Sequence, residues 1–270
     1  MRTFAGICLA VAFALGVSQA FSAETTKIKD AESATHAADD AQHRTVDTYK
    51  FSGFEVVQVN LPVLSHYSYI LVSGKDALVV DPDRDVQFYL DHAARNGLAI
   101  RGVYLSHSHA DFVAGHLEIV KAAGCPIYQS AESGAGYKIE GLRDGSTLRI
   151  GSAVVRILAT PGHTPDGTCA LVCSGEDDRT GKVVFTGDTL FIGSVGRPDL
   201  LEGKMTAASL ASMGFDSWVS KLSKLDDAVL VLPAHGAGSL CGAHLSDSPK
   251  STIGAERASN PYLQHRNRYD

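Results

Sequence analysis

The segment LSHSHADFVAGH, residues 105–116, places His107, His109 and Asp111 at alternate positions and then continues with Phe112. Imidazole nitrogens and carboxylate oxygens are donors that zinc and iron take in proteins. A phenyl ring has no lone pair to offer a metal ion, so the run of potential ligands stops at residue 112. The segment therefore predicts a metal site and raises the question of how many ions it holds.

Three further apolar runs lead directly into residues that can bind a metal. VRILATPGHT contains His163, KVVFTGDTL contains Asp188, and AVLVLPAHG contains His235. In α/β folds, sites form at strand ends because the loops there converge on one crevice. We therefore interpret His163 and Asp188, together with the two histidines of the first segment, as metal-site candidates. A turn aspartate is the alternative interpretation of Asp188, and the roles of His66 and His116 stay open.

The spacing of apolar residues around these segments indicates alternating strands and helices from Phe51 onward. FEVVQVNL and YSYILVSG are strand-like, whereas residues 86–97, 115–124 and 205–225 have helical spacing. Residues 227–236 are expected to form the last strand. A chain of 270 residues with 44% apolar and 20% charged residues is typical of one globular domain. The formal net charge of -6, with no basic block, argues against a nucleic-acid partner.

The N-terminal segment differs from the rest of the chain. An apolar stretch at 4–17 follows Arg2 and precedes small residues in SQAFSA, which predicts a signal peptide at residues 1–23. The stretch is shorter than the roughly 20 residues of a membrane span, so we expect no stable span, with an anchor or buried helix as the alternative. We expect export to the periplasm or secretion.

The remaining boundaries follow from composition. Residues 24–48 are polar and alanine-rich and are expected to be a leader or linker. Residues 49–245 are assigned to the folded domain and residues 246–270 to a C-terminal tail. Four cysteines remain after signal removal, and their pairing does not follow from sequence. Cys169 and Cys173 are interpreted as buried small residues on one face of a strand.

The motifs HSHAD, PGHT, TGDTLF and PAHG, in this order, resemble the metallo-β-lactamase fold, whose usual first motif is H-x-H-x-D-H. The resemblance covers roughly residues 51–236. It implies an α/β fold, an αββα sandwich of two sheets in a single domain, with a metal site along one sheet edge. Fold alone does not settle function.

A closer resemblance connects HADFVAGH, GDTLFIGSVGRPDL, PAHGAGSLCG and STIGAER to the persulfide dioxygenase branch, especially forms that precede rhodanese domains. It implies that His107, His163 and Asp188 bind one Fe(II) per chain. Phe112 stands where dinuclear relatives place the histidine that starts their second metal site. Without that histidine the second site keeps at best Asp111, Asp188 and His235, so a single ion is expected.

The implied reaction oxidises a low-molecular-weight persulfide, such as glutathione persulfide, with O2 to sulfite and the parent thiol. His109, Asp111 and His235 are expected to orient ligands or water beside the metal. Arg197 is a candidate for pairing with a substrate carboxylate, with a surface salt bridge as the alternative. A rhodanese domain or protein is the expected partner, and a homodimer is compatible with these features.

Two other functions remain open at this stage. If His109 also binds the metal, three histidines and an aspartate form a site nearer to a zinc hydrolase. A zinc-dependent thioester hydrolase of the glyoxalase II kind is therefore the second interpretation. A non-catalytic metal-binding or sulfur-binding protein is the third.

Overall fold

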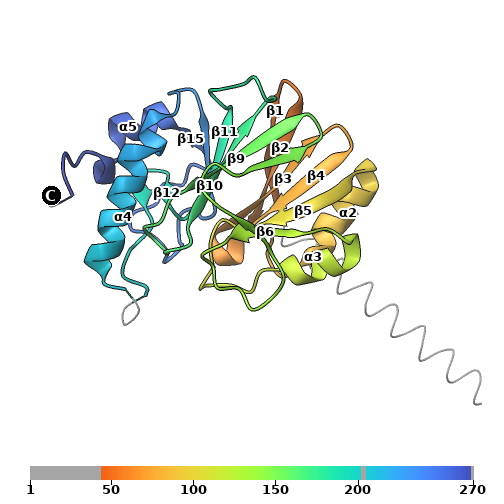
Figure 1. Cartoon of the computed structure of the whole chain (residues 1–270), viewed down its shortest axis with the longest axis horizontal. Helices are drawn as coiled ribbons and strands as arrows, with labels where there is room; N and C mark the ends of the chain where they lie inside the picture. Colours follow the sequence, from red (N-terminus) through yellow and green to blue (C-terminus); the bar gives the residue numbers. More distant parts are fainter. Residues whose placement is uncertain (1–43, 202–204, 269–270) are drawn as a thin grey trace, which may run out of the picture. The chain divides into compact units, whose positions relative to one another are not determined.

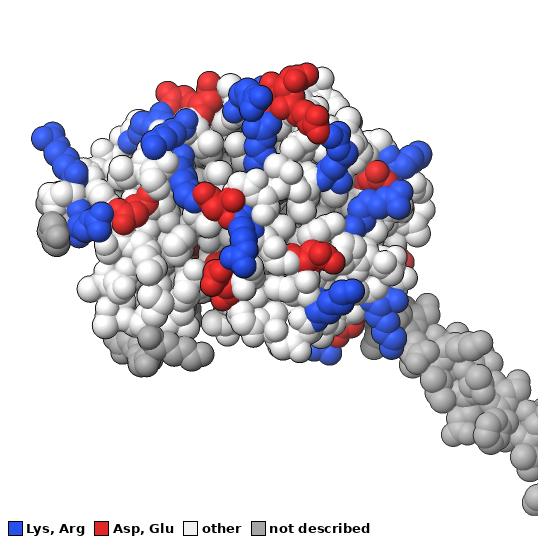
Figure 2. Space-filling view, in the orientation of Figure 1, with Lys and Arg blue, Asp and Glu red and all other residues white. Residues whose placement is uncertain are grey.

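The structure, a computed structural model, describes residues 44–201 and 205–268. The predicted signal peptide and most of the predicted leader lie outside these residues. No helix among the described residues is long and apolar enough to cross a membrane. On the face seen in Figure 2, basic and acidic side chains are intermingled, without a large area of one sign.

The first sheet contains seven strands in the order of the sequence. β1 to β4 pair antiparallel, and β4 to β7 pair parallel. Helices α2 (Val86–Asn96) and α3 (His116–Ala123) make two of the parallel crossovers, and each ends at a left-handed glycine, Gly97 or Gly124. The strands are β1 (Arg44–Phe51), β2 (Phe54–Leu61), β3 (His66–Ser73), β4 (Asp76–Val80), β5 (Ala99–Tyr104), β6 (Ile127–Ser130) and β7 (Glu140–Leu142), with a 3-10 turn η1 (Pro62–Leu64) before β3.

The second sheet contains six strands in the order β15-β14-β11-β10-β9-β8. Helix α4 (Ala207–Ser220) makes the crossover between the parallel strands β11 and β14, and Thr206 caps its first turn. Its strands are β8 (Thr147–Ile150), β9 (Ala153–Ala159), β10 (Thr168–Cys173), β11 (Val183–Gly187), β14 (Leu230–Pro233) and β15 (Ser251–Thr252). The other elements are the hairpin β12 (Leu190–Phe191) and β13 (Ser194–Val195), helix α5 (Ile253–Ser259), and turns η2 (Leu222–Lys224) and η3 (Pro261–Leu263).

The two sheets pack face to face with helices outside, as the sequence predicts (Figure 1). The central core joins Tyr69 and Leu71 of the first sheet to Ile157 and Phe185 of the second. A second core lies under α2 and α3, and a third lies under α4 and α5. Because β10 is buried on both faces, its alternate residues face different cores. Cys169 and Cys173 both face the third core as free thiols, which confirms their interpretation as small buried residues.

The predicted domain boundaries differ from the structure at both ends. β1 begins at Arg44, inside the segment assigned to the leader. β15 pairs with β14 inside the segment assigned to the tail, and Ile253 of α5 is fully buried in the third core. The strand at residues 230–233 is therefore not the last one. These short elements gain their order from packing against distant strands, which a local pattern does not reveal.

Backbone hydrogen bonds join the two sheets at the end where the candidate ligands lie. Tyr67 N donates to Ala234 O at 2.7 Å, and Gly236 N donates to Ser65 O at 2.9 Å. Thr168 N donates to Ser106 O at 2.8 Å, which ties the loop after β5 to the start of β10. The ends of the strands that carry the motifs are thus fixed relative to one another.

Gly187, directly before Asp188, provides a test of this tight junction. Its φ of +51° lies in the left-handed region, and a Cβ atom there would be 2.5 Å from Ser106 Oγ. Gly74 has a similar φ of +63°, but no atom lies within 4 Å of the corresponding Cβ position. We expect Gly74→Ala to lower the free energy of unfolding by about 1 kcal/mol and Gly187→Ala by about 3 kcal/mol. Urea denaturation of both variants measures the difference, and equal losses would show that the contact with Ser106 carries no cost.

Candidate metal centre

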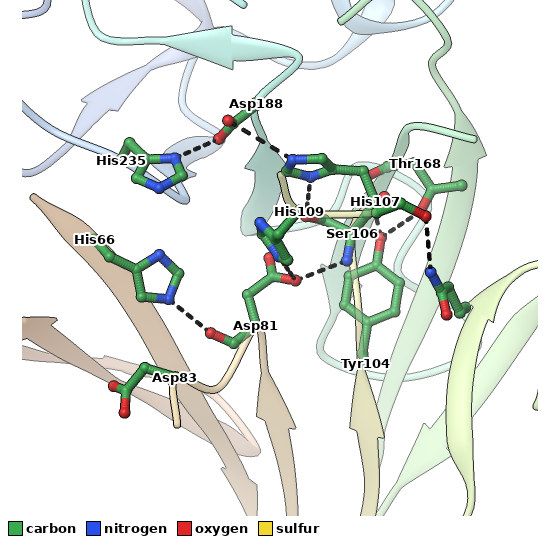
Figure 3. A network of polar contacts seen from close by, with 12 residues as sticks. His66, Asp81, Asp83, Tyr104, Ser106, His107, His109, Thr168, Asp188 and His235 are labelled. Carbon is green, nitrogen blue, oxygen red and sulfur yellow. Dashed lines mark hydrogen bonds and ion pairs between the residues drawn. The ribbon is translucent and has the colours of Figure 1, made fainter. Parts of the chain in front are cut away.

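The predicted ligands come together where strands of both sheets end, and Figure 3 shows His107, His109, Asp188 and His235 close to one another. His107 follows β5 of the first sheet, whereas Asp188 follows β11 and His235 follows β14 of the second. His163 lies in the loop between β9 and β10. Because β9, β11 and β14 run in the same direction, their carboxyl ends lie at one sheet edge.

The side chains of His107, His163 and Asp188 form the first group of potential metal ligands. Their ligating atoms lie within 4.8 Å of one another, and all three residues are buried. Asp188 Oδ2 lies 3.7 Å from His107 Nε2 and 3.5 Å from His163 Nε2, and it has no hydrogen-bond partner. A buried carboxylate oxygen that faces two imidazole nitrogens without hydrogen bonds is suited to a shared cation.

The other ring nitrogens of this group are anchored away from Asp188. His163 Nδ1 donates to the carbonyl oxygen of Arg197 at 2.8 Å. His107 Nδ1 shares a hydrogen bond with Ser106 Oγ at 3.0 Å. Histidine ligands commonly use one nitrogen for the metal while the second is held by an oxygen of the protein. The first group therefore fits a metal ion in its donor chemistry and its orientation.

His109 is held in the same way but lies outside the first group. Its Nε2 donates to Asp81 Oδ1 at 3.0 Å, which leaves Nδ1 with the lone pair in the neutral ring. That atom is buried without a hydrogen-bond partner, and the ring centroid lies 4.1 Å from that of His107. His109 can thus accept a proton or donate to a metal through Nδ1, and both sequence interpretations remain available.

Asp81 is a site residue that the sequence analysis missed. It follows β4, has a φ of +46°, and also accepts a hydrogen bond from Ser106 N at 2.8 Å. Burial raises the pKa of its carboxyl, but His109, His107 and the hydrogen bond from Ser106 N together outweigh burial and lower the pKa. Its carbonyl oxygen accepts from His66 Nε2 at 2.8 Å. Asp81 lies at a strand end like the predicted ligands, and the same rule would have found it in VVDP.

Phe112 fills the space beside these histidines. Its ring centroid lies 4.3 Å from that of His66, 4.4 Å from that of His109 and 6.4 Å from that of His235. His66 is fully buried, and burial lowers its pKa to about 4, so the ring is neutral at physiological pH. His116 instead lies beside Tyr137, with ring centroids 4.7 Å apart and the two ring planes tilted by 44°. The phenyl ring therefore forms an apolar wall of the site, with His66 behind it.

A second group of potential ligands lies on the other side of Asp188. Asp111, His235 and Cys241 have ligating atoms within 4.8 Å of one another. His235 Nε2 lies 2.9 Å from Asp111 Oδ2, and its Nδ1 donates to Asp188 Oδ1 at 2.8 Å. Cys241 is not among the residues predicted for the site, since its segment, GSLCG, contributes to the prediction only through the family resemblance.

The ionisable groups of the site are strongly coupled. Burial opposes ionisation of Asp188, but the imidazoles of His235 and His107 hold its pKa well below its usual value. Burial and the neighbouring His109 lower the pKa of His107 to about 3. Burial also disfavours the charged form of His235, yet Asp188 and Asp111 raise its pKa to about 10. Without a cation, His235 carries the positive charge between the two carboxylates.

Arg197 contributes its backbone to the site. Its carbonyl oxygen holds His163, while its guanidinium forms a two-point ion pair with Asp199 at 2.7 and 2.6 Å. Arg197 also lines a cavity of about 360 Å³ next to His163, whose other walls include Phe215 and Trp218 of α4. The side chain is 43% exposed, so it is available both to solvent and to a molecule in this cavity.

Comparison with known proteins agrees with this geometry. The family model for the metallo-beta-lactamase superfamily matches residues 61–235. A metallo-β-lactamase structure from Staphylococcus aureus is similar at 31% identity and a TM-score of 0.73, covering 80% of this chain and 65% of that one. ETHE1 from Myxococcus xanthus is similar at 28% identity and a TM-score of 0.67, covering 78% of this chain and 85% of that one. A hydroxyacylglutathione hydrolase of Francisella tularensis subsp. novicida is 30% identical over 64% of this chain and 63% of its own length.

Two single substitutions separate a metal ligand from its neighbour. We expect His107→Ala to abolish metal binding at the first group, because two protein donors are too few to hold a divalent ion against water. We expect His109→Ala to retain the metal and to lose activity by about 10- to 100-fold, as changes beside a metal ligand typically do. Metal content and turnover are measured side by side. Equal loss of metal in both variants would make His109 a fourth ligand.

Proposed function

The chain belongs to the metallo-β-lactamase superfamily of metal-dependent enzymes, and we propose that it is an iron-dependent persulfide dioxygenase. The observation that carries this proposal is the first group, in which His107, His163 and Asp188 supply two imidazoles and one carboxylate. Such a set leaves open positions on the metal and is typical of Fe(II) enzymes that use O2. Phe112 supports it, since a phenyl ring replaces the histidine of dinuclear relatives.

The proposed reaction converts a persulfide RSSH, O2 and H2O into the thiol RSH and sulfite with two protons. The sulfur–sulfur bond breaks, the two sulfur atoms together lose four electrons as the outer one becomes sulfite and the inner one thiol, and O2 is reduced by the same four electrons. Fe(II) held by the first group supplies the redox chemistry and the open positions that this oxidation needs. The chain's own residues must hold the metal, orient the substrate and receive its proton.

The proton acceptor we propose is His109. Its Nδ1 is unprotonated in the neutral ring because Nε2 donates to Asp81. Among the described residues, Nδ1 has no hydrogen-bond partner. The ring lies beside His107, so Nδ1 is close to any substrate at the first group. Phe112 and His66 cover the same side of the site and limit the access of water to it. Asp111 and His235 lie across Asp188 and are positioned to orient water there.

The remainder of the substrate is proposed to occupy the cavity between His163 and α4. Arg197 lies on its wall, and a substrate carboxylate can compete with Asp199 for the guanidinium. We also propose, from the sequence alone, that the protein is exported and that a rhodanese domain or protein handles the same sulfur. Neither proposal alters the chemistry of the first group.

A zinc-dependent thioester hydrolase is the second candidate. Two observations favour it: the similarity to a hydroxyacylglutathione hydrolase, and the presence of a second group of donors across Asp188. Enzymes with two adjacent metal ions use both to activate water and the substrate carbonyl. This candidate requires a metal ion at both groups and requires no O2.

Metal analysis together with an oxygen electrode distinguishes the candidates. We expect the full-length protein to contain about one iron per chain and to consume O2 when glutathione persulfide is added. Asp188→Asn, which keeps the shape of the side chain and removes its charge, should lower both iron content and O2 uptake. Zinc at the first group, cleavage of a glutathione thioester and no O2 uptake would contradict the dioxygenase proposal and support the hydrolase.

A further inference from the structure

The cavity of about 360 Å³ beside His163 has an apolar wall that the proposed reaction does not explain. His163 belongs both to this wall and to the first group, so a molecule in the cavity lies next to a metal ligand. We propose that the cavity selects a persulfide on an alkyl or aryl carrier, in preference to glutathione persulfide. This inference rests on the proposed function and deepens it, since it names the class of substrate.

Helix α4 turns one side toward the cavity. Residues 211, 215 and 218 of the helix, and residue 222 just beyond it, line the cavity at the three- and four-residue intervals of one helix face. Phe215 and Trp218 are only partly buried, so both side chains keep apolar surface that a ligand can cover. The large apolar side chains of the lining include Leu210, Phe215, Trp218, Leu222, Val195 and Leu263.

The two guanidinium groups that line the cavity are already paired with carboxylates. Arg197 donates to both oxygens of Asp199 at 2.7 and 2.6 Å, and Arg268 donates to Asp216 at 2.9 Å. No aspartate, glutamate or lysine of the described chain lines the cavity. Burying a charged group without a partner is costly, and glutathione carries two carboxylates and an ammonium group. An alkyl or aryl carrier brings one carboxylate at most, to which Arg197 can donate.

The volume of the cavity sets the size of the carrier. Apolar cavities of about 150 Å³ hold one benzene molecule. The cavity beside His163, at about 360 Å³, therefore has room for a phenyl ring with a short chain, or for an alkyl chain of similar volume. Each CH2 group buried against an apolar wall raises the affinity by about fourfold. A longer carrier thus binds more tightly until the cavity is filled.

The chain contains one tryptophan, Trp218, and its position in the lining provides a test. The full-length, metal-loaded protein is titrated anaerobically with mercaptopropionate, mercaptooctanoate and glutathione. All three compounds have a thiol, so contact of the sulfur with the metal is common to them and the differences report the carrier. Calorimetry measures the affinity, and Trp218 fluorescence reports binding in the cavity. We expect mercaptooctanoate to bind about tenfold or more tightly than either other thiol and to change the Trp218 emission.

A matched pair of variants on α4 assigns this binding to the cavity. Ala211 lines the cavity and Ala208 does not, although both are exposed residues of the same helix. Ala211→Leu adds carbon atoms to the lining and should weaken mercaptooctanoate binding by about tenfold. Ala208→Leu should leave the affinity within about twofold of the wild-type value. Equal affinity of the wild-type protein for mercaptooctanoate and glutathione, or equal affinity of the two variants for mercaptooctanoate, would overturn the proposal.

Turnover separates this inference from the function on which it rests. The persulfides of mercaptooctanoate and of glutathione are compared with an oxygen electrode. We expect kcat/KM to be about tenfold higher for mercaptooctanoate persulfide, and Ala211→Leu should remove this preference. A higher kcat/KM for glutathione persulfide would overturn the carrier class and leave the dioxygenase in place. Selective binding of mercaptooctanoate without O2 uptake from either persulfide would instead overturn the dioxygenase and leave the preference of the cavity for apolar carriers.

Discussion

The carboxylate of Asp188 is the interaction on which the rest of the site depends. Burying an ionised carboxylate is costly unless its oxygens meet positive charge or hydrogen-bond donors. Here Oδ1 accepts from His235, and Oδ2 faces the Nε2 atoms of His107 and His163. In the chain without metal, protonated His235 balances the charge, as its raised pKa indicates. A cation held by His107, His163 and Asp188 would take over this balance through the same carboxylate.

The fold supplies this arrangement by joining two sheets at one end. A sandwich closes its core with apolar side chains, and Tyr69, Phe185 and their neighbours do so here. At the site, the two sheets are joined by a backbone hydrogen bond from Tyr67 N to Ala234 O instead of by apolar side chains. The strands that end there are followed by polar residues, and these side chains meet in the shared space. The ligands are therefore placed by rigid strands of both sheets rather than by a single loop.

Much of this could be predicted from the sequence, because the strongest signals are local. The glycine stops of α2 and α3, and the strand ends that carry His107, His163 and Asp188, are read from a few neighbouring residues. β15 and α5 were missed since their order comes from packing on β14 and the third core. Cys241 was missed for the same reason, since it lies 130 residues from Asp111 along the chain. Sequence shows which residues can bind a metal, whereas only the fold shows which of them meet.

Arg197 shows most clearly why side-chain chemistry alone misses part of a site. Its guanidinium suggests a substrate contact, yet its backbone N–H donates to Cys241 O and its carbonyl oxygen accepts from His163. Every residue type except proline has both backbone groups, so the identity of residue 197 does not indicate this role. The preceding residue, Gly196, does indicate this role. A Cβ atom on Gly196 would lie 1.9 Å from Asp188 O and 2.8 Å from His163 Cβ, so only glycine lets this segment approach both ligands. Gly196 therefore allows the backbone of the next residue, Arg197, to hold one residue of each group of potential metal ligands.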